Sequence, residues 1–191
     1  MEQFVNLVGQ SLIRRGILPS DDLDTFAYGL DMLLFSLATF SALLLLGWLT
    51  GCLLETALLA SVFSSLQSMG GGYHAQTHLR CFSLMLVGWG ASILLTRFVP
   101  ATALLIFLAF GWIAVIRFAP IEHTNAPMRI EKKTRMKAFV RRLVSFYFII
   151  ACICYFVNAR SFSAIATAVG MAGISQCVAT YSSRRQHPDN P

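Results

Sequence analysis

Charged residues are scarce in this sequence, and their scarcity excludes a soluble globular domain. Only 13% of the 191 residues are charged and 56% are hydrophobic, whereas soluble domains average about 25% charged residues. Acidic residues are the scarcest, with 9 Asp and Glu against 15 Lys and Arg, which leaves a formal net charge of +6. The positive charge is concentrated in a few stretches, which argues against a nucleic-acid-binding surface. The composition therefore predicts an integral membrane protein whose main solvent is the lipid bilayer.

Two further patterns are missing. Residues 1–20 contain no continuous apolar run, so no secretory signal peptide is expected. The five cysteines are an odd number and include no CxxC pair, so neither a disulfide framework nor a cysteine-paired metal site is expected. We expect four of them to be small apolar side chains of the interior: Cys52, Cys152, Cys154 and Cys177.

Six apolar segments follow an amphipathic N-terminus. In residues 1–18, Phe4, Leu7, Val8 and Leu12 recur at helical spacing. We therefore expect residues 1–20 to form a helix lying in the membrane interface, with a core helix as the alternative. The apolar segments are 25–49, 52–66, 82–95, 101–116, 143–157 and 162–179. The first and second, and the third and fourth, are joined so closely that helical hairpins are expected.

These segments predict one all-α membrane domain over residues 1–191, a polytopic helical bundle. Because a full span needs about 20 apolar residues, six spans or four spans plus two re-entrant helices both fit. The predicted parts are the interfacial helix 1–20, four segments in 25–118, a basic loop at 119–142, two segments in 143–180 and a tail at 181–191. The last segment is rich in small residues, which would allow close packing within the chain or at a homodimer seam.

The positions of Lys and Arg predict the orientation. In a six-span topology thirteen of the fifteen share one side, and only Arg97 and Arg160 lie opposite. We therefore expect the cell membrane as the location, with both termini and residues 70–81 on the cytoplasmic side. Residues 129–142 are the most basic stretch, which favours contact with lipid headgroups and is compatible with docking of an acidic peptide. The candidate docking residues are Arg129, Lys132, Lys133 and Arg135.

The stretch 70–81 reads GGGYHAQTHLRC and holds most of the chain's reactive side chains. Three interpretations compete for it. It is a plain interfacial loop, or a zinc site built from His74, His78 and Cys81, or a Cys–His nucleophilic pair. Zinc lacks a fourth ligand and the HExxH pattern, so we expect no metal. The nucleophilic pair is the most informative hypothesis because polar groups at a membrane face usually serve a function.

Geometry constrains which histidine serves Cys81. In one continuous helix His74 would lie about 10 Å from Cys81 along the axis, whereas His78 would be its neighbour. The three glycines predict an end to the preceding helix, and Thr77 is a plausible N-cap of the next. A folded loop could then bring His74 back over the first turn. There the positive end of the helix dipole and the nearby Arg80 favour a thiolate.

The arrangement GGYHA-x5-C, in a basic membrane protein with six apolar segments, resembles the accessory gene regulator B family. The stretch APIEHTNAP at 119–127 is similar to that family's proline-bracketed loop. The resemblance implies a membrane cysteine endopeptidase of Gram-positive bacteria that cuts a short propeptide on the cytoplasmic side and forms a cyclic thiolactone or lactone for quorum sensing. It implies Cys81 as nucleophile, His74 as general base and acid, and Gly72 as the loop glycine.

Other residues are candidates for supporting roles. The family often has Arg seven residues before the histidine, where this chain has Gln67. Gln67 and Gln76 are candidates to orient the imidazole, and backbone N–H groups near Cys81 are candidate oxyanion donors. Asp31 and Glu55 are expected to make interhelical hydrogen bonds instead. No cofactor is expected, and the alternatives to an enzyme are a small peptide transporter and a non-catalytic membrane scaffold.

Overall fold

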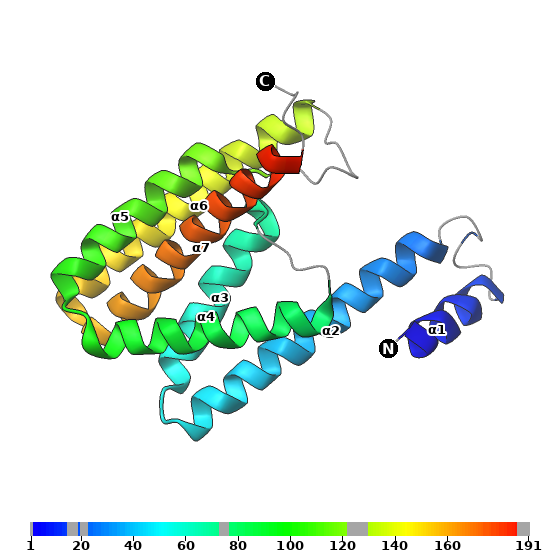
Figure 1. Cartoon of the computed structure of the whole chain (residues 1–191), viewed down its shortest axis with the longest axis horizontal. Coiled ribbons are helices and arrows are strands. Elements are labelled where there is room, and N and C mark those ends of the chain that lie inside the picture. The colour runs from blue at the N-terminus through cyan, green and yellow to red at the C-terminus, as the bar shows by residue number, and fades with distance from the viewer. Residues whose placement is uncertain (1, 15–18, 20–22, 73–76, 122–129, 187–191) are drawn as a thin grey trace. The chain divides into compact units, whose positions relative to one another are not determined.

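The computed structural model describes residues 2–14, 19, 23–72, 77–121 and 130–186. Within these ranges the chain forms α-helices and no strand (Figure 1), which confirms the predicted all-α membrane bundle. The helices are α1 (Glu2–Arg14), α2 (Leu23–Leu49), α3 (Leu53–Gly70), α4 (His78–Phe98), α5 (Ala101–Phe118), α6 (Ile130–Val157) and α7 (Ala159–Gln186).

Each predicted apolar segment coincides with one helix, and the expected hairpins α2–α3 and α4–α5 have short connections. The main difference lies at α6, which begins at Ile130 although apolar character begins near Leu143. Residues 130–142 were expected to be part of a basic loop. They are helical because Lys and Arg are good helix formers and the helix continues beyond its apolar part.

Five of the described helices are long and apolar enough to span a membrane: α2, α4, α5, α6 and α7. The predicted alternatives were six spans, or four spans plus two re-entrant helices. The count of five differs from both because α3 is not apolar enough over its length to be included. Helix α3 has 18 residues, as many as α5, but carries Glu55, Ser65 and Gln67 among its apolar residues. It packs against α4, α6 and α7. Each of these three polar side chains has a partner on another helix, namely Arg160 for Glu55, Tyr147 for Ser65 and Ser175 for Gln67. Such contacts allow α3 a more polar sequence.

The chain divides into two compact units, residues 1–42 and 43–191. In the first unit, Gly9 of α1 faces the start of α2, where a Cβ at Gly9 would lie 2.5 Å from Leu23 Cδ1. Leu7, on another face of α1, is 66% exposed. Helix α1 is therefore the predicted N-terminal helix, with Gly9 against α2 and Leu7 exposed. Its location in the membrane interface stays a prediction.

Helix α7 is the central helix of the second unit, where it contacts α3, α4, α5 and α6. Residues 162–170 of α7 are buried without interruption. Close approach explains the small residues, since a Cβ at Gly173 would lie 2.7 Å from Gly111 Cα of α5. The ring of Phe107 lies directly over Gly170. The small residues therefore serve packing within the chain, and a homodimer stays a prediction.

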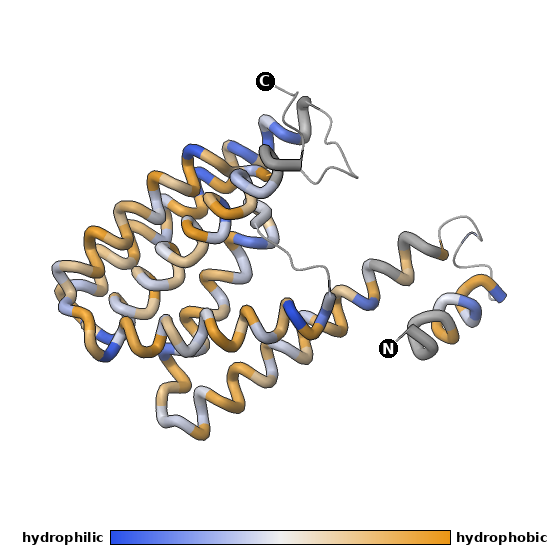
Figure 2. The backbone as a smooth tube through the Cα atoms, viewed as in Figure 1, coloured by the Kyte–Doolittle hydropathy of each residue, from blue (hydrophilic) through white to orange (hydrophobic). Residues whose placement is uncertain are grey.

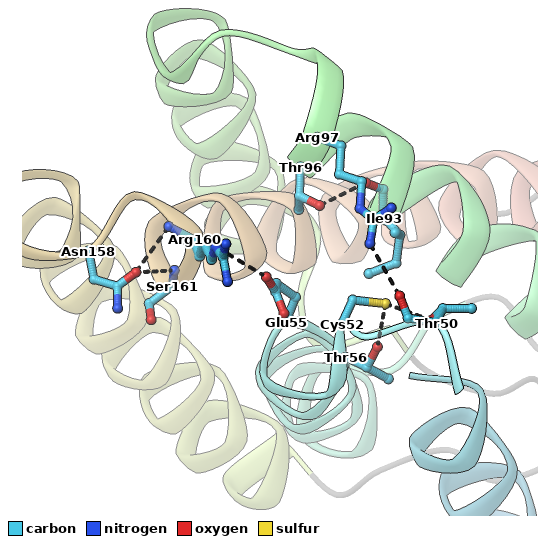
Figure 3. Close-up of polar contacts among 10 residues, drawn as sticks. All are labelled: Thr50, Cys52, Glu55, Thr56, Ile93, Thr96, Arg97, Asn158, Arg160 and Ser161. Atoms are coloured by element: carbon cyan, nitrogen blue, oxygen red, sulfur yellow. Dashed lines mark hydrogen bonds and ion pairs between the residues drawn. The ribbon is translucent and has the colours of Figure 1, made fainter. Parts of the chain in front are cut away.

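The second unit has two distinct ends. At the Glu55 end, Arg160 Nε lies 4.0 Å from Glu55 Oε1, and Arg97 Nη2 donates to the Thr50 carbonyl at 3.4 Å (Figure 3). Three connections meet here, and a pocket of about 340 Å³ opens between them. It is lined by Gly51, Cys52, Glu55, Thr96, Arg97 and Arg160.

At the opposite end, called here the Gly70 end, the last residue of α3 meets three other segments. A Cβ at Gly70 would lie 3.5 Å from Ala119 Cβ and from Val140 Cγ1, and 2.6 Å from Gln176 Nε2. Helix α6 extends ten residues before Val140, or about 15 Å at the rise of a helix. The hydrophilic residues of this extension stand out in Figure 2.

The basic residues are distributed unequally between the Glu55 end and the Gly70 end. Arg97 and Arg160 lie at the Glu55 end, whereas the basic residues of α6 begin the helix beside the Gly70 end. The α6 residues are Lys132, Lys133, Arg135, Lys137, Arg141 and Arg142. Between the ends, large apolar side chains such as Ile106, Ile113 and Phe146 are exposed, as expected for helices that face lipid.

Candidate active site

Cys81 lies in the first turn of α4. Thr77 precedes the helix in an extended conformation (φ −132°, ψ 147°), and its Oγ1 accepts a hydrogen bond from the Arg80 backbone N–H at 3.4 Å. This confirms Thr77 as the N-cap. The Cys81 N–H donates to the Thr77 carbonyl at 3.0 Å. Cys81 is therefore held close to the positive end of the helix dipole, but its own N–H is already bonded and does not serve as an oxyanion donor.

The surroundings of Cys81 are only partly protein. The thiol is free and half-buried, while Leu79 is 75% exposed. Further along α4, Trp89 Nε1 donates to Thr56 Oγ1 of α3 at 3.0 Å. Trp89 is eight residues after Cys81, or about 12 Å along the helix. The thiol is therefore partly accessible, directly after the three exposed residues that begin the helix.

Two histidines, His74 and His78, are the candidate bases. His78 is the first residue of α4 and is exposed, on the same face as Cys81. His74 and Gln76 lie outside the described residues. Because Thr77 is extended, α4 does not continue back to His74. The 10 Å separation of one continuous helix therefore does not apply to His74 and Cys81.

The predicted end of the preceding helix is also confirmed. Helix α3 ends at Gly70, and Gly71 has a φ of 69°, a conformation that favours glycine. The Gly71 N–H donates to the Gln67 carbonyl, and the Ile121 N–H donates to the Gly70 carbonyl, both at 2.9 Å. The glycine turn that leads toward His74 is therefore bonded to the start of the proline-bracketed loop, a contact that the sequence did not predict.

Two glutamine side chains pack against this turn. Gln67 Nε2 donates to Ser175 Oγ at 2.8 Å, and the buried Gly72 lies directly against the Gln67 amide. Gln176 is fully buried, and its Nε2 lies 3.5 Å from the Gly71 carbonyl, to which it donates. The Oε1 atoms of Gln67 and Gln176 are buried without a partner in the described part of the chain. A buried polar atom left unpaired costs about 1–3 kcal/mol.

Sequence reasoning identified Gln67 but missed Gln176. The available signal was a large amide side chain in residues 161–180, which are otherwise small or apolar, because polar residues within a membrane segment are usually functional. What could not be read from the sequence is the partner, since Gly71 precedes Gln176 by 105 residues.

The acidic residue Glu55 takes no part in this cluster. It lies 15 residues before Gly70 on α3, which places it about 22 Å away along the helix. It forms instead an ion pair with Arg160 of α7, with 4.0 Å between Arg160 Nε and Glu55 Oε1, a contact between helices but not the expected hydrogen bond. Asp31 belongs to the first unit, in α2.

The remaining predicted residues are exposed or lie outside the described chain. Arg80 is exposed and contributes its backbone N–H to the Thr77 cap. Lys133 and Arg135 are exposed on the first turns of α6. Lys132 belongs to the same helix, but its side chain, like Arg129, is outside the described part. Among the described residues no group of three His, Cys, Asp or Glu side chains is placed to hold a metal ion.

The profile of the family Accessory gene regulator B matches residues 2–178. The chain belongs to the accessory gene regulator B family. The match covers the capped turn of Cys81, the glycine turn and nearly all of both compact units, so the resemblance drawn from residues 70–81 is confirmed. Membership of the accessory gene regulator B family supports a role in the processing of quorum-sensing peptides at the membrane. Neither the curated proteins nor the solved structures contain a match to the chain.

Proposed function

We propose that the chain is a membrane-embedded cysteine endopeptidase that cleaves a short propeptide and promotes its cyclisation to a thiolactone or lactone. The observation that carries this proposal is the local structure around Cys81. A free thiol sits in a capped first turn of α4, and the segment between this turn and the glycine turn contains His74. Both compact units would belong to one peptidase domain, because the family match spans them.

In the proposed reaction, the Cys81 thiolate attacks a backbone carbonyl of the propeptide and the peptide C–N bond breaks. His74, which has taken the thiol proton, gives it to the leaving amine. The acyl-enzyme is a thioester. A Cys thiol or Ser hydroxyl within the bound fragment then attacks the thioester, which closes the ring and releases Cys81 as a thiol. The tethered nucleophile reacts at a high effective concentration, which favours cyclisation over hydrolysis.

The oxyanion of the tetrahedral intermediate requires donors near Cys81. The backbone N–H groups of Arg80 and Cys81 both donate to Thr77. The Leu79 N–H lies in the first turn as well, where no intrahelical acceptor is available to it. Side chains of a helix lean toward its N-terminus, so the Cys81 sulfur is directed toward this donor. We assign the oxyanion contact to Leu79.

The orientation that suits this reaction places the Gly70 end in the cytoplasm. The support is the distribution of basic residues. Those of α6 lie at the start of that helix, beside the Gly70 end, whereas Arg97 and Arg160 lie at the Glu55 end. Lys and Arg are retained on the cytoplasmic side of membrane proteins. Both termini and the site would then be cytoplasmic, where a newly made propeptide is found.

The extension of α6 is the proposed docking surface for an acidic part of the propeptide. Lys133 and Arg135 are exposed there, before Val140, which contacts the glycine turn. Replacing both by Gln should raise KM for a propeptide with an acidic segment by about tenfold at low salt and leave kcat unchanged, because exposed charges act over short, salt-screened distances. The matched control removes two positive charges at the other end, in Arg97→Gln/Arg160→Gln, and should leave KM unchanged.

The proposed function is tested by propeptide cleavage in vesicles that contain the purified full-length protein. Cys81→Ser should abolish cleavage while membrane insertion is retained, and His74→Ala should be as damaging. His78→Ala should keep most of the activity. If His78→Ala is inactive and His74→Ala active, His78 is the base. If Cys81→Ser still supports peptide release, the chain is a transporter rather than a peptidase.

A further inference from the structure

Resting on the proposed function, we infer that Gln176 of α7 is a positioning residue for catalysis. It holds the turn Gly70–Gly72, and with it the start of the segment that carries the general base. Gln176 does not touch the reacting atoms. Its effect on the reaction comes from the hydrogen bond between its Nε2 and the Gly71 carbonyl.

The first support is the placement of Gln176. It is 0% exposed, and it is the largest polar side chain among the fully buried residues of the described chain. Its Nε2 would lie 2.6 Å from a Cβ at Gly70, so the amide occupies the space that a side chain there would fill. The Gln176 amide can therefore take this position only because residue 70 is a glycine.

The second support is that a neighbouring amide holds the other side of the same turn. Gln67 lies against Gly72, and its Nε2 donates to Ser175, the residue before Gln176. Helix α7 thus contacts Gly71 directly and Gly72 through Gln67. The described part of the chain shows no other side-chain hydrogen bond to the turn, so α7 supplies its side-chain support, beside the backbone hydrogen bond from Ile121 to Gly70.

The third support is that the arrangement is not optimal for stability. Both amides donate a hydrogen bond, yet their Oε1 atoms are buried without a partner in the described residues. An apolar side chain of similar size would remove the unpaired Oε1 of Gln176 and would lose only one hydrogen bond, which at 3.5 Å is longer than usual. A side chain kept only for bundle stability would not be expected to be a glutamine here.

The test uses the full-length protein in vesicles, after Cys81→Ser has been shown to abolish cleavage. Gln176→Met, which keeps the length of the side chain and removes the donor, should lower kcat by about 10-fold to 100-fold, because a displacement of about 1 Å in a catalytic group costs about 100-fold. KM should change by less than twofold, and the midpoint of thermal unfolding in detergent should be unchanged or higher. Hydrogen exchange should rise at the amides of Gly71 and Ile121 and not in the centre of α5.

Thr167→Val is the matched control, since Thr167 is equally buried on α7 and its hydroxyl bonds only to the Ser163 carbonyl. It should keep full kcat. A wild-type kcat in Gln176→Met would overturn the inference. It would also be overturned if Gln176→Met and Thr167→Val lost kcat and thermal stability to the same extent, because the effect would then be one of general destabilisation. If Gln176→Met does not fold, Gln176→Leu provides the same comparison. Cleavage that survives Cys81→Ser would instead refute the proposed function.

Discussion

The close approach of α5 and α7 gives the sharpest prediction about the fold. A Cβ at Gly111 would lie 2.6 Å from the carbonyl carbon of Val169 and 2.7 Å from Gly170 Cα. Carbon atoms in contact are normally about 3.5–4.0 Å apart, so in Gly111→Ala the two helices must separate by about 1 Å. The atoms met are backbone atoms, which no rotamer change can move aside.

The expected cost follows from two opposing effects. Overpacking a core costs about 1–3 kcal/mol, and a backbone clash at the centre of the bundle belongs at the upper end. Alanine in place of glycine within a helix returns about 1 kcal/mol. Gly111→Ala should therefore lower the free energy of unfolding by about 2 kcal/mol.

Gly90→Ala on α4 is the matched control, because a Cβ there meets nothing within 4 Å. It should raise the free energy of unfolding by up to about 1 kcal/mol. Both variants are compared by circular dichroism during unfolding in detergent micelles with increasing SDS. If Gly111→Ala proves as stable as Gly90→Ala, the packing of α5 on α7 described here is wrong.

Three smaller changes test other contacts. Trp89→Phe removes the donor to Thr56 and should destabilise the bundle by about 1 kcal/mol, measured by the same unfolding; no change would mean that the hydrogen bond contributes nothing. Thr77→Ala removes the cap of the helix that carries Cys81, at a cost of about 1 kcal/mol. It should reduce propeptide cleavage, whereas Thr77→Ser should not. Equal cleavage by the two variants would show that the cap is not needed for catalysis. Glu55→Gln should change stability by less than about 1 kcal/mol, because its partner Arg160 is 81% exposed, and should leave cleavage intact; loss of peptide release without loss of cleavage would point to a transport path through Glu55.

The helices were predictable because their apolar runs are long and their ends carry clear signals. The N-cap at Thr77 and the helix end at Gly71 follow from residue type and position alone, since each is a local property of the backbone. The end of a helix in water is harder to place. Hydropathy located the start of α6 near Leu143, while the helix begins at Ile130, because charged residues continue a helix without any apolar signal.

The number of spans and the anchor of the site depend on tertiary contacts. The apolar segment 52–66 fitted both a span and a re-entrant helix, and the contacts of α3 with α6 and α7 were not readable from the sequence. The hydrogen bond from Gln176 to Gly71 joins residues far apart in the sequence, as does that from Ile121 to Gly70. No periodicity or local motif encodes such pairs, so the sequence could suggest candidate residues such as Cys81 and His74 but not the contacts that hold the glycine turn.

The most direct test of the proposed chemistry is mass spectrometry of the intact protein after rapid mixing with its propeptide. We expect a covalent adduct with the mass of the acyl fragment, attached at Cys81 and removed by hydroxylamine as a thioester would be. Propeptide that is fully processed with no adduct at Cys81 at any mixing time, and with unchanged rate in Cys81→Ala, would contradict the account.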